Sequence, residues 1–292
     1  MIPAAFDYIV PQNIDDALRA LATHGEEAKL LAGGHSLLPL LKLRLASPKL
    51  LIDLSKVPGL RGIAQRDDKI VVGALATHYQ IESSELLRAK CPLLPQAAAA
   101  IGDVQVRNCG TIGGSLVHAD PSADWPAAIL ALGGRLKLSG PKGERQMAVE
   151  EFFLGPMTTA IEPAEILTEI SVPVSSRRCG TVYLKMAQQA SGFAVVGIAV
   201  WLRMDTKGRC EDIGVGVTGL SEKPFRSKAI EELLRGNKLT SKLVEAGAAQ
   251  VTEGRVPLED LHASGKFRVH LAQVYTSRAL QEAMKRAVAR KV

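Results

Sequence analysis

The sequence predicts an α+β protein built from two domains. The chain has 292 residues, a length that typical domain sizes divide into two. In its first part, short apolar runs typical of strands alternate with helical patterns, whereas in its last part strands precede a run of helices. A stretch rich in Ser and Arg, at residues 173–178, is typical of a linker. We therefore expect one domain over residues 1–175 and a smaller one over residues 176–292.

The first 56 residues predict a small βαβ unit. Asn13 is a good N-cap for a helix, and Gly25 is a typical residue to end it. Two apolar runs flank a second helical pattern, as expected of two buried strands joined by a helix. The predicted elements are a helix over 14–24, a strand over 28–32, a helix over 37–45 and a strand over 50–54.

Residues 57–175 predict a second subdomain, in which hairpins and helices are mixed. Asp67 and Asp68 form the turn of one hairpin, and the Gly-Pro-Lys-Gly run at 140–143 forms the turn of another. The predicted elements are hairpins over 63–72 and 135–149, helices over 76–87, 93–101 and 124–132, and a strand over 166–172.

The last part of the chain predicts a sheet followed by helices. Two apolar strands are expected over 194–204 and 211–217, with a turn at 205–208. Helical patterns follow over 227–234, 241–251 and 265–289. This order predicts a small α+β domain whose sheet is covered on one face by helices.

Two glycine-rich segments about eighty residues apart are the strongest functional signal. The first, residues 32–39, reads Ala-Gly-Gly-His-Ser-Leu-Leu-Pro, and the second, residues 111–120, reads Thr-Ile-Gly-Gly-Ser-Leu-Val-His-Ala-Asp. Paired glycines allow positive φ angles and bring bare N–H groups close to a ligand. Successive free N–H groups and hydroxyls suit phosphate. We expect the two segments to hold the two phosphates of a dinucleotide from opposite sides, the alternative being a pair of structural turns.

Composition excludes several other classes of function. The net charge is +6, but the basic residues are scattered and the aromatic content is 4%, which is poor for stacking on nucleic-acid bases. No apolar run reaches membrane-spanning length. The N-terminus lacks the basic start of a signal or transit peptide. We expect a cytoplasmic protein that has no membrane-spanning segment and does not bind nucleic acid.

Other candidate motifs are weaker. The Gly-x-Gly-x-x-Gly pattern at 214–219 opens no helix and is followed by Pro224, so a tightly packed strand is favoured over a Rossmann dinucleotide site. His118, Asp120 and Asp124 admit three interpretations: a metal or acid–base cluster, a turn that caps a helix, and acceptors for ligand hydroxyls. The dispersed histidines show no metal-ligand spacing, and no catalytic triad or activated cysteine is visible.

The first segment, together with the Asp-Pro-Ser-Ala-Asp-Trp-Pro-Ala run at 120–127, is more specific than its glycines alone. The chain resembles, over nearly its whole length, the FAD-binding medium subunits of molybdenum hydroxylases. This family includes the carbon monoxide dehydrogenase medium chain and the flavin domain of xanthine dehydrogenase. The resemblance implies an FAD-binding domain of the vanillyl-alcohol-oxidase (PCMH) type over 1–175, with subdomains of about 1–56 and 57–175, and a C-terminal flavoprotein domain over 176–292.

The resemblance also implies where FAD binds. The pyrophosphate lies against the first segment, the second closes on the other side, and His118 and Asp124 lie near ribityl or adenosine hydroxyls. Ile101 faces the isoalloxazine ring, Leu167 lines the adenine end and Lys185 lies near the flavin. Phe193 stands near the place where some relatives bring a tyrosine over the ring, and Ser115 stands where many have asparagine. The full set implied is Ala32, Gly33, Gly34, His35, Ser36, Leu37, Ile101, Thr111, Gly113, Gly114, Ser115, His118, Asp124, Leu167, Lys185 and Phe193.

The partners follow from the same resemblance. It implies a molybdopterin-binding large subunit, a small subunit with two [2Fe–2S] clusters, and a dimer of heterotrimers that passes electrons to a quinone, NAD or dioxygen. The four cysteines here lack cluster spacing, in keeping with clusters held elsewhere. A self-contained flavin oxidase or dehydrogenase and a non-catalytic nucleotide-binding assembly module are the alternatives. The sequence does not distinguish among carbon monoxide, an aldehyde, a purine, an N-heterocycle and an aromatic thioester as the substrate.

Overall fold

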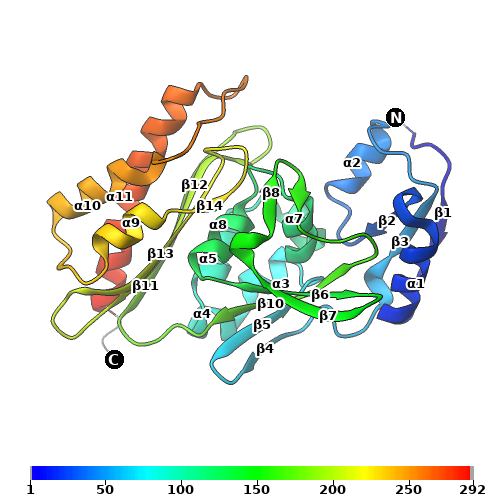
Figure 1. Cartoon of the computed structure of the whole chain (residues 1–292), viewed down its shortest axis with the longest axis horizontal. Helices are drawn as coiled ribbons and strands as arrows, with labels where there is room; N and C mark the ends of the chain where they lie inside the picture. Colours follow the sequence, from blue (N-terminus) through cyan, green and yellow to red (C-terminus); the bar gives the residue numbers. More distant parts are fainter. Residues whose placement is uncertain (1, 290–292) are drawn as a thin grey trace.

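The computed structural model describes residues 2–289, which form three parts along the long axis of the molecule (Figure 1). A small N-terminal unit lies at one end, a five-stranded sheet with its helices lies in the middle, and a four-stranded sheet with its helices lies at the other end. Helices and strands are mixed in every part, so the α+β prediction is confirmed.

The N-terminal unit is the predicted βαβ arrangement with one additional strand. Its parallel sheet has the order β1-β3-β2. Asn13 caps the first helix through the Asp16 N–H, at 2.8 Å, and Gly25 ends that helix with a φ of 52°, as predicted. The elements are β1 (Asp7–Ile9), α1 (Ile14–His24), β2 (Ala28–Leu31), α2 (Leu37–Lys42) and β3 (Leu50–Asp53).

The middle part has an antiparallel sheet of order β4-β5-β10-β6-β7, and most of its helices pack into one large apolar core. The strands are β4 (Ile63–Arg66), β5 (Lys69–Gly73), β6 (Arg135–Gly140), β7 (Gly143–Ala148) and β10 (Ile166–Pro173), with a separate β8–β9 hairpin (Phe153–Gly155, Thr158–Thr159). The helices are α3 (His78–Ser83), α4 (Glu85–Lys90), α5 (Leu93–Ala100), α6 (Val104–Cys109), α7 (Ile112–His118) and α8 (Asp124–Ala131).

The helix predicted over 76–87 is two helices in the structure. Thr77 and Gln80 form a reciprocal capping box at the start of α3. Ser84, in an extended conformation, ends α3 and accepts the Leu87 N–H at 3.3 Å to begin α4. Because a serine hydroxyl satisfies the free N–H groups at a helix start, it favours a new helix over continuation of the old one.

The C-terminal part has an antiparallel sheet of order β11-β12-β13-β14. Its first strand was not predicted, whereas the following two strands and three helices were. The elements are β11 (Cys179–Ala187), β12 (Ala194–Met204), β13 (Cys210–Thr218), β14 (Phe225–Arg226), α9 (Lys228–Leu234), α10 (Ser241–Ala249) and α11 (Gly265–Ala289).

The helices of the C-terminal part cover one face of its sheet, as predicted, and a helix of the preceding part covers the other face. Helix α11 packs on β11 and β12, whereas α8 of the preceding part packs on β12 and β13. A Cβ on Gly214 or Gly216 would lie 1.9 Å from the carbonyl oxygen of Ala131 or Ala127. These glycines of the Gly-x-Gly-x-x-Gly pattern therefore admit a helix against the strand, which agrees with the packed-strand interpretation.

Within residues 2–289, no helix combines the length and apolar character needed to cross a membrane.

Candidate functional site

The first glycine segment is an open turn between β2 and α2. Gly34 has a φ of 73°, in the left-handed region that favours glycine. Among residues 2–289, the N–H groups of Gly34, His35 and Ser36 have no hydrogen-bond acceptor. The hydroxyl of Ser36 does not cap α2, and the ring of His35 contacts the Gly33 carbonyl through Nδ1, at 3.0 Å. This turn offers several free donors side by side, as an anion site requires.

The second glycine segment lacks the free N–H groups that we expected, because residues 112–118 form helix α7. Its backbone donors are already satisfied: Ile112 donates to the Ala76 carbonyl at 3.1 Å and Gly113 to the Ala74 carbonyl at 2.8 Å. Thr111 caps the helix by accepting the Gly114 N–H at 3.2 Å. This segment therefore presents side chains, such as the Ser115 hydroxyl, and not free N–H groups.

The fold nevertheless brings the two glycine segments into direct contact. A Cβ on Gly33 would lie only 2.2 Å from the Cys109 carbonyl oxygen and 2.8 Å from the Gly110 Cα. A Cβ on Gly114 would lie 3.6 Å from the Cβ of Ala32. Because only hydrogen fits at Gly33, the first segment packs directly on the backbone that leads into α7.

His78 lies beneath this junction and was missed by sequence reasoning. The Trp125 indole N–H donates to His78 Nδ1 at 3.0 Å, so the neutral ring carries its proton on Nε2. The backbone N–H of His78 donates to the Gly110 carbonyl at 3.0 Å. Burial, aided by His35 and Arg107, lowers the pKa of His78 to about 4. Its partner Trp125 is 47 residues away in the sequence, so no local sequence pattern predicts the contact between them.

Asp124 and Lys185 form a buried ion pair between α8 and β11. The Lys185 ammonium lies 2.9 Å from Asp124 Oδ1 and donates to the Gly192 carbonyl at 2.5 Å. The Tyr183 hydroxyl donates to the same carboxylate. Burial raises the pKa of Asp124, whereas Lys185 and Tyr183 oppose that shift. Burial together with the neighbouring carboxylate raises the pKa of Tyr183 well above its usual value.

The sequence suggested that residues 120–124 form a turn that caps α8, and the structure corrects part of this. Asp120 does accept the Ser122 N–H at 2.8 Å, as a turn requires. The N-cap, however, is Ala123, and Asp124 is the first residue of the helix. Tyr183 escaped notice because β11, the strand that carries it, was not predicted.

Two of the expected ring-facing residues lie on adjacent turns. Ile101 ends α5, and Phe193, 40% exposed, precedes β12. A Cβ on Gly192 would lie 3.3 Å from the Gly102 Cα, so the turns that carry Ile101 and Phe193 touch.

The two remaining candidates lie differently. Leu167 in β10 is only 5% exposed and belongs to the main apolar core, where it is paired with Leu138 of β6. Its side chain offers little surface to a ligand. His118 is the last residue of α7 and is half-buried.

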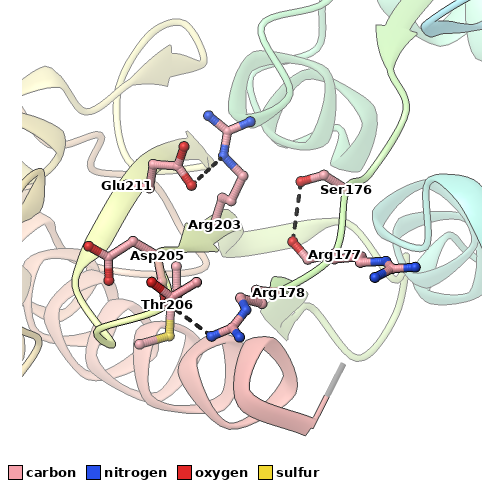
Figure 2. A pocket seen from close by; sticks show the side chains of 8 residues that line it. Ser176, Arg177, Arg178, Arg203, Asp205, Thr206 and Glu211 are labelled. Carbon is pink, nitrogen blue, oxygen red and sulfur yellow. Dashed lines mark hydrogen bonds and ion pairs between the residues drawn. The ribbon is translucent and has the colours of Figure 1, made fainter. Parts of the chain in front are cut away.

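A separate cavity of about 550 Å³ lies at the far end of the C-terminal sheet from Phe193. Its three arginines do not converge on a common point (Figure 2). Arg203 pairs with Glu211 at 3.2 Å, and Arg178 donates to the Asp205 carbonyl at 3.4 Å. Because the guanidinium groups diverge and those of Arg203 and Arg178 contact protein groups, we assign no ligand to this cavity.

Comparison with known proteins agrees with this geometry. Residues 4–175 match the FAD binding domain in molybdopterin dehydrogenase, and residues 181–283 match the CO dehydrogenase flavoprotein C-terminal domain. The chain is 37% identical to the carbon monoxide dehydrogenase medium chain of Hydrogenophaga pseudoflava, over 98% of this chain and 99% of that protein. It is 34% identical to the 6-hydroxypseudooxynicotine dehydrogenase complex subunit alpha of Paenarthrobacter nicotinovorans, over 98% and 97%.

The solved structures give the same result. The fold superimposes on a chain of carbon monoxide dehydrogenase from Hydrogenophaga pseudoflava with a TM-score of 0.95 and 38% identity, covering 98% of this chain and 99% of that one. Similarity of this extent covers the glycine segments, the Asp124–Lys185 pair and the C-terminal sheet together. The chain therefore belongs to the FAD-binding medium subunits of the molybdenum hydroxylases, a family of oxidoreductases.

Proposed function

We propose that this chain holds FAD along the junction of its three parts and passes electrons from a partner's iron–sulfur clusters to an external acceptor. The observation that carries the proposal is the first glycine segment, which has free N–H groups at Gly34, His35 and Ser36 and packs through Gly33 on the backbone at Cys109. Neighbouring free N–H donors of this kind suit a diphosphate, and the positive φ of Gly34 is a conformation that glycine adopts readily.

The residues divide the work of binding. Gly34, His35 and Ser36 would donate to the diphosphate, and the Ser115 hydroxyl would add a donor from α7. Ile101 and Phe193 would cover the ring system from adjacent turns. When bound, FAD supplies the electron-carrying group, and the protein supplies position and electrostatics.

The Asp124–Lys185 pair sets the local charge near the ring. Because both carboxylate oxygens of Asp124 have donors and its Lys185 partner is positive, the pair as a whole is close to neutral. We infer that Lys185 acts on the flavin mainly as an oriented N–H donor, since the neighbouring carboxylate offsets its full charge. A lysine at this place would favour a flavin that has gained electron density.

The partners are also part of the proposal. A large molybdopterin-binding subunit would oxidise the substrate, and a small subunit with two [2Fe–2S] clusters would deliver the electrons. A dimer of such heterotrimers in the cytoplasm and an acceptor such as a quinone, NAD or dioxygen complete the assignment. This proposal rests on near-complete coverage of relatives that are named as medium chains or complex subunits.

The test is to purify the chain alone and together with the proposed large and small subunits. We expect FAD near one equivalent in the complex, with anaerobic flavin reduction by the complex's substrate only when all three subunits are present. Flavin reduction by an organic substrate in the isolated chain would instead favour a self-contained oxidase. A chain without flavin, alone and in the complex, would favour the assembly module.

A further inference from the structure

Arg107 of α6 connects three segments around the expected ring site. Its Nη1 donates to the carbonyls of Ile101, at 3.0 Å, and Gly102, at 3.2 Å. Its Nε lies 2.8 Å from the Glu82 carboxylate of α3, with the N–H directed away from that oxygen, so this contact is an ion pair. The arginine side chain is 16% exposed.

An arginine suits this place because α5 ends here. The last carbonyls of a helix have no partner within the helix, and Ile101 is the C-cap of α5. A planar guanidinium can donate to two carbonyls from one nitrogen while pairing with a carboxylate on another edge. The turn at Ile101 and Gly102 is thus fixed by a residue that follows it in sequence.

The effect of Arg107 reaches the opposite wall of the ring site. Gly192 packs on Gly102, so the turn that carries Phe193 rests on the turn that Arg107 fixes. Lys185 holds the Gly192 carbonyl from the other side, at 2.5 Å. One cation therefore fixes each of the two touching turns.

Arg107 is also linked to the diphosphate side. Helix α6 ends at Cys109, and the Cys109 carbonyl is the atom against which Gly33 packs. Arg107 precedes Cys109 by two residues, so its backbone lies within one helical turn of the contact between the two glycine segments. A change in the position of α6 would therefore alter both the turn at Ile101 and the contact between Gly33 and Cys109.

We propose that Arg107 is a positioning residue for FAD, which couples the ring walls at Ile101 and Phe193 to the diphosphate turn at Gly33. It acts through backbone carbonyls and not by touching the cofactor. This role rests on the proposed function, since it requires that the flavin ring bind between those turns.

The test compares Arg107→Gln with Arg88→Gln in the full-length chain, using FAD itself as the probe. Arg88 is a matched control, because it donates to the Glu82 backbone carbonyl at 3.1 Å, is exposed, and has no contact with Ile101. The measurements are the Kd for FAD, the visible circular dichroism of the bound flavin and the Tm. Circular dichroism of the ring reports how firmly an asymmetric wall holds it, which thermal stability does not.

For Arg107→Gln we expect the Kd for FAD to rise about tenfold or more, because two charge-assisted hydrogen bonds are lost. The visible dichroism of the remaining bound flavin should weaken. Arg107→Lys, which keeps the charge and one donor direction, should retain part of both signals and serves if the glutamine variant does not fold. Arg88→Gln should match the unsubstituted chain.

Two results would count against the proposal in different ways. If both Arg107 variants bind FAD with unchanged Kd and dichroism while only the Tm falls, Arg107 is merely structural and the inference is wrong. If the unsubstituted chain takes up no FAD, alone or with its partner subunits, the proposed function itself fails and takes this role with it.

Discussion

Both glycine segments contain a Gly-Gly pair and a nearby serine, as Gly-Gly-His-Ser in the first and Gly-Gly-Ser in the second. Their backbones nevertheless differ. In the first segment, Gly34 has a positive φ and leaves neighbouring N–H groups free. In the second, Gly113 lies inside a helix and its N–H is bonded to the Ala74 carbonyl. In the proposed function, glycine in the first segment therefore serves a ligand, whereas glycine in the second serves packing. Variants that separate cofactor retention from stability test this difference.

The largest expected effect concerns His78, whose backbone N–H donates to the carbonyl of Gly110, next to the second segment. Below pH 6.5 an unfolded chain protonates this histidine, whereas the folded chain keeps it neutral down to about pH 4. The unfolded state thus binds more protons, and folding stability falls by about 3 kcal/mol as the pH drops through that window. Chemical unfolding at several pH values should show this loss, and His78→Gln should lack it. An exposed control, His24→Gln, should keep it; an equally steep acid dependence in His78→Gln would contradict the assignment.

The next effect is expected at Gly113. An added Cβ would lie 2.5 Å from the Ala74 Cβ and 2.6 Å from its carbonyl oxygen. We expect Gly113→Ala to cost about 2 kcal/mol in spite of the better helix propensity of alanine, and to lose FAD only as the fold is lost. Gly247→Ala is the control, because that helical glycine has 3.4 Å of room to Leu234. Thermal unfolding checks both, and unchanged stability in Gly113→Ala would remove the packing role.

Substitution of Gly34 should, in contrast to Gly113, affect FAD retention more than stability. Gly34→Ala places a side chain at a φ of 73° and should cost about 1 kcal/mol. It should also lower the FAD retained per folded chain, because the free N–H groups would shift. Gly25, with a φ of 52° and no atom near an added Cβ, gives a control with similar strain away from the site. Equal flavin content in Gly34→Ala and Gly25→Ala would show that the first segment does not bind the diphosphate.

The smallest effects compare two hydroxyls. Thr111→Ala removes the cap of α7 and should cost about 1 kcal/mol of stability. Ser36→Ala removes a hydroxyl that caps nothing and should weaken FAD binding while the Tm stays unchanged. Flavin titration and thermal unfolding on both variants give the comparison. If Thr111→Ala weakened only FAD binding and Ser36→Ala lowered only the Tm, the assignment of packing to the second segment and ligand binding to the first would be wrong.

The sequence was sufficient to predict those elements whose boundaries are set by residues nearby in the chain. Asn13 and Gly25 correctly bounded α1, and the prediction of α11 agrees with the helix found within the described residues. The first glycine segment was recognised as an open turn because its glycines and hydroxyl act locally. The FAD contacts of the sixteen residues named from the sequence stay predictions.

The sequence was insufficient to predict local structure and contacts that depend on residues far away in the chain. The second segment looks like a loop because two glycines disfavour a helix, yet carbonyls of Ala74 and Ala76 hold its first turn in place. His78, Tyr183 and Arg107 became candidates only when the fold showed what they contact. Their main partners come from other elements of the fold, so no spacing rule could have found them.

The packing of α8 on the glycines of β13 has a consequence for how the chain holds together. Every residue of α8 is buried, because the helix is enclosed by its own part on one side and by the C-terminal sheet on the other. A chain cut at the linker would expose a row of alanines on one fragment and bare strand backbone at Gly214 and Gly216 on the other. The boundary between the two matched family domains thus separates two parts that share a buried interface.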